Sequence, residues 1–295
     1  MNILRTFDLG KKFRSAVALE GLNLSVPEGS VFALIGSNGA GKTTVIKILM
    51  NILQPTSGHT ETLGRRKLSP RELQQIGYVS ENQEMPEWMT VEYFMAYLKP
   101  FYPTWDDARA EELLRQFELP RDRKLKHLSR GMKMKAALAS SLAYRPKLIV
   151  LDEPFSGLDP LVRDELIEGL LESASEATIL ISSHDLAEIE SFASHVGYLD
   201  SGRLRFSEEM TALSARFREV EVTLDRNGLP ENLPPTWLRP EKSAAVVRFV
   251  DSQFDEARTM ADIRRLFGDP RSVSINPMPL RSIFVTLAKA ERKAA

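Results

Sequence analysis

Cysteine is absent from this chain of 295 residues. Its absence excludes disulfide bonds and thiolate metal sites, and it is compatible with a reducing compartment. Long apolar runs are also missing: no stretch approaches the 18 apolar residues of a membrane helix, and residues 1–12 lack the apolar core of a signal peptide. We therefore expect a cytoplasmic chain that does not cross a membrane by itself.

The chain also lacks an excess of charge of either sign. Its 39 Lys and Arg residues nearly balance 40 Asp and Glu residues, so the formal net charge is −1. We therefore expect no broad basic surface for nucleic acid and no acidic disordered tail. The length allows one large domain with a small one, or two ordinary domains.

Residues Gly36 to Thr43 read G-S-N-G-A-G-K-T, which fits the phosphate-binding pattern G-x-x-x-x-G-K-[ST]. The apolar run Val31 to Ile35 predicts a strand before the loop, and Thr44 to Met50 predicts a helix after it. Loop N–H groups and a helix N-terminus attract phosphate, Lys42 is expected to reach the β- and γ-phosphates, and the Thr43 hydroxyl is expected to bind Mg²⁺. The expected nucleotide-binding residues here are Gly36, Ser37, Asn38, Gly39, Ala40, Gly41, Lys42, Thr43 and Thr44.

Short apolar runs predict a parallel sheet around this loop. Leu148 to Leu151 and Thr178 to Ile181 are continuously apolar and end at polar residues. Such runs are typical of strands buried on both faces, and ligands bind at the carboxyl ends of such strands. Nearer the N-terminus, Leu22 to Val26 and Val31 to Ile35 flank a Pro-Glu-Gly turn, which predicts a strand pair leading into the loop.

Polar side chains at two predicted strand ends are candidates for chemistry. Asp152 suits a Mg²⁺ shell, and Glu153 can orient and deprotonate a water for in-line attack on a γ-phosphorus. His184, at the other strand end, could hydrogen-bond the γ-phosphate and position that water. Read alone, the two acids could instead cap a helix, and a lone histidine is more often structural.

Between the phosphate loop and Asp152, the sequence from Trp88 to Tyr144 has a helical pattern and many aromatic residues. It predicts a helical subdomain over about residues 86–145. Its aromatic residues close together in sequence are Trp88, Tyr93, Phe94, Tyr97, Phe101, Tyr102 and Trp105. We expect most of these rings to fill the core of the subdomain. Trp88 and Trp105, in less regular stretches, are the better candidates for an exposed interface.

The character of the chain changes after Phe206, which predicts a domain at 1–208 and a small α+β domain at 209–295. The proline-rich stretch Pro230 to Pro240 is expected to be a loop. The other elements expected are strands at Glu219 to Leu224, Ala244 to Val250 and Ser272 to Ile275, a helix at Phe254 to Phe267, and a last helix whose apolar face carries Leu280, Ile283, Phe284 and Leu287.

Further motifs follow the phosphate loop in a characteristic order. L-S-R-G-M at 128–132 is followed by L-I-V-L-D-E at 148–153, S-G-L-D at 156–159 and His184. With these motifs the chain resembles, over about residues 4–206, the nucleotide-binding subunits of ATP-binding-cassette (ABC) transporters. The resemblance implies an α/β fold: a P-loop NTPase core with an N-terminal antiparallel β subdomain, a helical subdomain and, here, the C-terminal α+β domain.

The resemblance also assigns roles and partners. Nucleotide contacts fall on Phe13, which stacks on adenine, and on Ser129, Gly131 and Asp159; catalysis falls on Glu153 and His184. Ser129 is also expected to cap a helix that begins near Gly131. Two chains, expected to be identical, would pair head to tail around two ATP molecules and drive a separate integral-membrane subunit from the inner face of the membrane. Aromatic side chains would line a groove for that subunit.

Three positions depart from the family pattern. Arg130 and Met132 stand where the family signature has a glycine and a glutamine, and Glu81 stands where a metal-contacting glutamine is usual. Glu81 is the favoured metal contact, with Gln83 as the alternative. The form of this segment and the C-terminal domain resemble ABC-2-type bacterial exporter ATPases, so we expect export. The alternative is a soluble ABC ATPase that acts in regulation or on nucleic acid or ribosomes.

Overall fold

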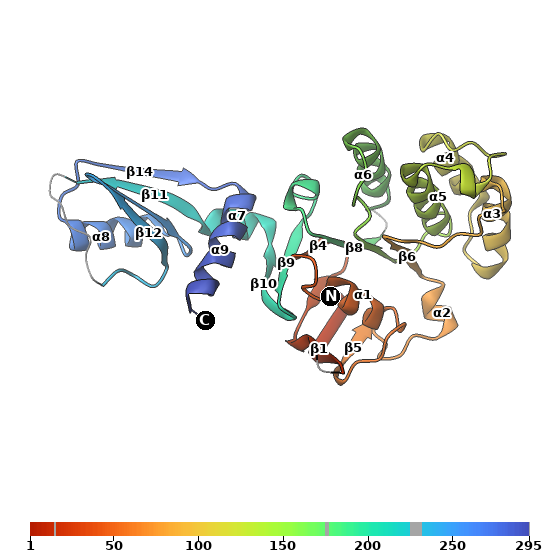
Figure 1. The fold of residues 1–295 in the computed structure, drawn as a ribbon, viewed down its shortest axis with the longest axis horizontal. Helices are drawn as coiled ribbons and strands as arrows, with labels where there is room; N and C mark the ends of the chain where they lie inside the picture. Colours follow the sequence, from red (N-terminus) through yellow and green to blue (C-terminus); the bar gives the residue numbers. More distant parts are fainter. Residues whose placement is uncertain (15, 175–176, 225–231, 295) are drawn as a thin grey trace. The chain divides into compact units, whose positions relative to one another are not determined.

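The computed structural model describes residues 1–14, 16–174, 177–224 and 232–294 (Figure 1). The chain divides into two compact units, Met1–Ser207 and Glu208–Ala295.

A six-stranded sheet forms the centre of the first unit, in the order β10-β9-β4-β8-β7-β6. Five of these strands are paired in parallel with one another: β9, β4, β8, β7 and β6. All residues of β4, β7 and β8 are buried, which explains the apolar runs that make up β4 and most of β7 and β8 and confirms the strands predicted there. The bounds are β4 Val31–Ile35, β6 Ile76–Ser80, β7 Leu148–Asp152, β8 Thr178–Ser183, β9 His195–Asp200 and β10 Arg203–Glu209.

A second, antiparallel sheet consists of β1 (Asn2–Phe13), β2 (Ala16–Leu22), β3 (Ser25–Pro27) and β5 (Ser57–Thr62), with the other three strands paired to β1. The predicted strand pair before the phosphate loop is therefore wrong, because β3 belongs to this sheet and β4 to the central one. An all-apolar strand such as β4 has to be covered on both faces. The turn at Pro27 to Gly29 therefore takes the chain from one sheet to the other.

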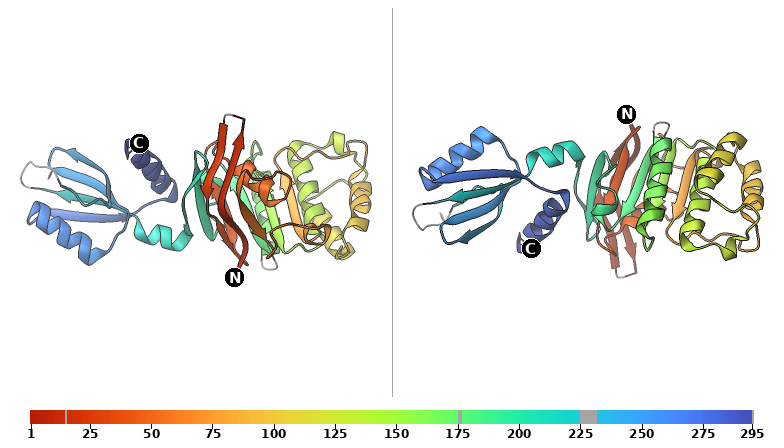
Figure 2. Two further views of the ribbon diagram at one scale, coloured as in Figure 1. Left: turned by 90° about the horizontal axis from the view of Figure 1, so that it is seen from below. Right: turned by 90° about the horizontal axis from the view of Figure 1, so that it is seen from above.

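Helices cover both sides of the central sheet. In Figure 1, α1 (Lys42–Leu49) and the antiparallel sheet lie on one side, and α6 (Pro160–Ala174) lies on the other. The helical subdomain gathers at the β6 edge (Figure 2). Its main helices, as predicted, are α3 (Val91–Leu98), α4 (Asp107–Gln116) and α5 (Arg130–Leu142). The first unit also contains short helices inside and outside this subdomain: α2 (Pro70–Leu73), η1 (Lys99–Phe101), η2 (Leu125–His127) and η3 (Leu186–Glu188).

The aromatic segment is mostly not core, contrary to expectation. Of its seven rings only Phe94 is buried, Tyr102 and Trp105 are half-buried, and the rest are exposed. The exposed fractions are 62% for Trp88, 51% for Tyr93, 46% for Tyr97 and 54% for Phe101. Aliphatic side chains of α4 and α5, such as Leu113 and Leu138, fill the subdomain instead, so α3 buries only one face.

The second unit is a four-stranded antiparallel sheet with helices. Its strands are β11 (Arg218–Thr223), β12 (Trp237–Ser243), β13 (Val246–Asp251) and β14 (Ser272–Pro277), in the order β12-β13-β11-β14, and its helices are α7 (Met210–Arg216), α8 (Glu256–Phe267) and α9 (Leu280–Ala294). The three predicted strands and two predicted helices are present. Strand β12 begins inside the stretch Pro230 to Pro240, so the predicted loop is wrong from Trp237 onward, and residues 230 and 231 of that stretch lie outside the described residues. An edge strand tolerates Pro240, which lies where the pairing register shifts between Leu238 and Glu241.

Candidate functional site

The carboxyl ends of the central strands meet at one edge of the sheet. The register pairs Ile35 with Ser183, Asp152 with Ser182, and Ser80 with Asp152. The residues that follow these strand ends therefore surround one pocket of about 300 Å³. Its lining residues are Ala18, Asn38, Gly39, Gly41, Lys42, Thr43, Thr44, Glu81, Glu153, Ser156 and His184.

The phosphate loop lies tightly against neighbouring backbone. A Cβ on Gly36 would lie 2.3 Å from the Leu199 carbonyl oxygen, and Gly41 has φ +109° with its missing Cβ 2.8 Å from the Ala18 carbonyl oxygen. Only glycine fits at both positions. Helix α1 begins at Lys42, so its first N–H groups, which have no partners within the helix, lie at the pocket.

Lys42 is buried, and its ammonium group has three acceptors. Its Nζ lies 2.6 Å from the Gly36 carbonyl oxygen, 3.2 Å from that of Ser37 and 3.0 Å from Oε1 of Glu153. These contacts match the three N–H donors of a lysine. An incoming phosphate would compete with the Glu153 carboxylate for this cation.

Glu153 also contacts the predicted histidine. Its Oε2 lies 2.6 Å from Nδ1 of His184, and this hydrogen bond raises the pKa of His184. The Glu153 backbone has φ +51°, a strained value for a residue other than glycine, and such strain is concentrated at functional sites. The fold thus brings Lys42, Glu153 and His184, predicted separately from three segments, into one hydrogen-bonded cluster.

Ser182 is a functional residue that the sequence interpretation missed. It is fully buried at the end of β8; its hydroxyl donates to Oδ1 of Asp152 at 2.7 Å and accepts from the Glu153 N–H at 3.0 Å. It therefore holds the carboxylate of Asp152 and the backbone of Glu153. A serine ending an apolar run is the only local signal, and it does not identify the partners.

Thr43 and Asp152 fit a magnesium site. The Thr43 hydroxyl lies 3.2 Å from Oδ1 of Asp152, so both oxygens face one point beside the loop. Among the described residues, no three His, Asp or Glu side chains form a metal-binding group. Magnesium is usually bound by one or two protein oxygens together with substrate phosphates and water, so this sparse set suits it.

Seven predicted nucleotide contacts are not among the lining residues of this pocket: Gly36, Ser37 and Ala40 within the loop, and Phe13, Ser129, Gly131 and Asp159 elsewhere. Phe13 is 45% exposed, with the Lys11 ammonium 5.0 Å from its ring centre. Ser129 caps α5, as predicted, by accepting the Met132 N–H at 3.2 Å, and Asp159 caps α6 through the Val162 N–H at 3.1 Å. Gly131 is buried against α6, and a Cβ there would lie 2.8 Å from Cγ1 of Val162.

Glu81 and Gln83 are separated by the structure. Glu81 lines the phosphate-loop pocket. Gln83 instead accepts hydrogen bonds from the Ser80 N–H and hydroxyl, both at 3.2 Å, and lines a groove next to the helical subdomain. This groove is walled by Met50, Ile52, Leu73, Ile76, Tyr78, Phe94, Tyr97, Leu98, Tyr102 and Tyr144, among others.

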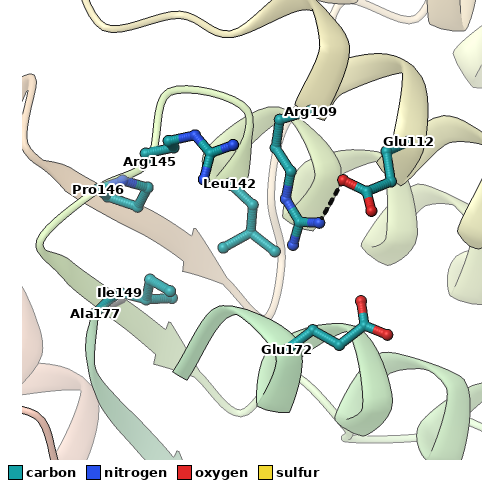
Figure 3. Close-up of a pocket in the computed structure, with 8 residues that line it drawn as sticks. All are labelled: Arg109, Glu112, Leu142, Arg145, Pro146, Ile149, Glu172 and Ala177. Carbon is teal, nitrogen blue, oxygen red and sulfur yellow. Dashed lines mark hydrogen bonds and ion pairs between the residues drawn. The ribbon is translucent and has the colours of Figure 1, made fainter. Parts of the chain in front are cut away.

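Another pocket lies away from the phosphate loop (Figure 3). Arg109, Glu112, Arg145 and Glu172 border it together with apolar residues of α5 and β7, and Arg109 pairs with Glu112 at 2.8 Å. None of the predicted site residues lines it. It gives no support to a second catalytic centre.

Comparison with known proteins agrees with this site. A family model described as ABC transporter matches residues 19–156. The ABC transporter ATP-binding protein YtrB of Bacillus subtilis is 30% identical over 74% of this chain and 75% of its own length. The daunorubicin/doxorubicin resistance ATP-binding protein DrrA of Streptomyces peucetius is 28% identical over 96% of this chain and 92% of its own.

Solved structures show the same fold. An ATP-binding subunit of an ABC transporter superposes with a TM-score of 0.66 and 31% identity, over 72% of this chain and 92% of that one. No helix in the described ranges is long and apolar enough to cross a bilayer. The predicted P-loop NTPase fold is confirmed, and the chain belongs to the ABC transporter family as an ATP-binding subunit.

Proposed function

We propose that this chain hydrolyses ATP and that two copies of it, closing head to tail around two ATP molecules, drive a separate membrane subunit. The observation that carries the proposal is the contact of Glu153 with both Lys42 and His184 at the mouth of the phosphate-loop pocket. This places a general-base candidate beside the cation and the hydrogen-bonding group that hydrolysis requires.

In the proposed reaction, the ATP phosphates take over Lys42 and release Glu153 from that ion pair. Glu153 then accepts a proton from a water whose oxygen attacks the γ-phosphorus in line, and the bond to the β–γ bridging oxygen breaks to leave ADP and phosphate. His184 holds the Glu153 carboxylate on one side and faces the γ-phosphate. Ser182 orients the Asp152 carboxylate and the Glu153 backbone.

Thr43 and Asp152 would hold Mg²⁺, with Glu81 as a further contact through water. When bound, the ion neutralises phosphate charge. Ser129, Gly131 and Asp159 lie outside the chain's own pocket, which agrees with a second chain using them to complete the site. Phe13, exposed on β1, keeps a ring face available for the adenine.

The groove beside the helical subdomain is the proposed docking site for the membrane subunit. Tyr97 lines it, and Trp88, Tyr93 and Phe101 extend the exposed aromatic surface nearby along the chain. Exposed aromatic patches mark protein interfaces. The chain would thus act at the inner face of the membrane, and its similarity to DrrA along both units favours export.

Glu153→Gln tests this function. The amide keeps the size of the side chain but cannot accept the proton, so we expect ATP binding to persist, hydrolysis to fall by about a hundredfold or more, and dimers to accumulate with ATP. Phosphate release and sedimentation with ATP or ADP measure these effects. Turnover within about twofold of the parent chain would exclude Glu153 as the base.

A further inference from the structure

The signature segment, L-S-R-G-M at residues 128–132, contains a cation, Arg130, to which no role has been assigned. Arg130 is the first residue of α5, and its Nη2 lies 3.5 Å from Oε1 of Glu81. Glu81 lines the phosphate-loop pocket, so the pair joins the signature segment to the chain's own nucleotide pocket. The family pattern has a neutral glycine at position 130 and a neutral glutamine at position 81. In this chain both positions are charged, with opposite signs, and the two side chains are in contact.

A second contact fixes where the guanidinium lies. Gly157 has φ +67°, and a Cβ on it would lie 2.9 Å from Nη1 of Arg130. The Arg130 guanidinium therefore has two neighbours. One is the Glu81 carboxylate, and the other is the backbone at Gly157, in the S-G-L-D segment that links β7 to α6. The guanidinium contacts two segments that begin at the catalytic edge of the sheet, one after β6 and one after β7.

We propose that Arg130 is an additional phosphate-binding residue of the ATP-bound dimer and that Glu81 holds it until the two chains close. The inference rests on the proposed head-to-tail dimer, in which the signature segment of one chain faces the ATP of the other. On closure, the guanidinium passes from the Glu81 carboxylate to the γ-phosphate of the second chain's ATP.

The charges and exposures support this exchange. Arg130 and Glu81 are 52% and 39% exposed, and an exposed ion pair contributes little to stability, so it is easily given up. A phosphate offers more negative charge and a geometry that the planar guanidinium binds with two hydrogen bonds. Release from Arg130 would also free the Glu81 carboxylate to act at its own pocket.

The test measures the dissociation constant of the ATP dimer in the Glu153→Gln parent chain, by sedimentation. Arg130→Gln should raise it about tenfold, and Arg130→Lys, which keeps the charge but not the fork, should raise it less. Glu81→Gln should lower it several-fold, because it releases Arg130. In the double variant, the Glu81 substitution should no longer tighten the dimer.

The controls separate phosphate binding from folding. Lys133→Gln removes a cation three residues along the same helix, paired with Glu87 at 3.6 Å, and should leave dimerisation unchanged. Binding of a fluorescent ATP analogue to dilute monomers should be equal in the parent, Arg130→Gln and Lys133→Gln chains.

Three results would overturn the inference. An unchanged dimer constant in Arg130→Gln excludes phosphate binding by Arg130, and so does a loss of equal size in Lys133→Gln. A Glu81→Gln effect that persists without Arg130 excludes the holding role. If the parent chain itself fails to dimerise with ATP, the proposed function fails first, and this is seen before any Arg130 variant is made.

Discussion

At the scale of single residues, the site depends on side chains that orient other side chains. Ser182 shows this best, because one buried hydroxyl serves the carboxylate of Asp152 and the backbone of Glu153. The Glu153 N–H also has the Ser182 carbonyl oxygen as a partner at 3.2 Å. The hydroxyl therefore matters most for Asp152, whose carboxylate is buried.

Ser182→Ala should lower the free energy of unfolding by about 1–3 kcal/mol, because the buried Asp152 carboxylate loses a donor. It should also raise the Mg²⁺ concentration needed for ATP binding. Denaturant unfolding and nucleotide titration measure the two effects. Ser140→Ala is the control: its hydroxyl is buried but bonds only within α5, to the Ala137 carbonyl oxygen, and it should cost less. Equal losses in both variants would contradict this account of Ser182.

At the scale of elements, the position of α5, which begins in the signature segment, depends on its contact with α6. Gly131 lies in the first turn of α5, where its missing side chain lets Val162 of α6 approach. The caps of the two helices, Ser129 and Asp159, lie close to this contact in sequence. Glycine is therefore required here for helix packing, apart from any contact with phosphate.

Gly131→Ala should destabilise the first unit by about 1–3 kcal/mol, because a Cβ 2.8 Å from Val162 forces the helices apart. Val162→Ala removes the opposing methyl groups. The double variant should regain about 1 kcal/mol or more relative to the sum of the single variants. Thermal unfolding of all four chains checks the coupling, and strictly additive effects would show that α5 and α6 do not meet as described.

At the scale of the whole molecule, each unit has its own core. The core of the second unit centres on Trp237, whose ring is stacked on Phe249 with centroids 3.8 Å apart. No residue of this core belongs to the phosphate-loop pocket. A ligand of the first unit should therefore stabilise that unit selectively.

ATP with Mg²⁺, at about 100 times its dissociation constant, should stabilise the first unit by about 2.7 kcal/mol and leave unfolding of the second unit unchanged. The chain has three tryptophans, so Trp88→Phe with Trp105→Phe leaves Trp237 as a fluorescent reporter of the second unit. Circular dichroism follows the whole chain. Chelation of Mg²⁺ should abolish the shift. An equal shift of the Trp237 transition would show that the units unfold together.

Local sequence was enough to predict the features that depend on neighbouring residues. The phosphate loop, the all-apolar strands and the helical stretches have patterns of a few residues, and the structure has strands and helices there. The Lys42, Glu153 and His184 cluster was also predictable in part, because parallel strands end at a common edge. Polarity at each strand end was visible in the sequence, but the distances between these groups were not.

Other features depended on tertiary structure. The separation of β3 and β4 into two sheets, the exposure of Tyr93, Tyr97 and Phe101, and the edge position of Pro240 all follow from which surfaces are covered by distant segments. Ser182 and the pair of Arg130 with Glu81 have partners 30 and 49 positions away. Local propensity acts over a few residues, whereas burial and hydrogen bonding act through space, so only the folded chain decides which groups meet.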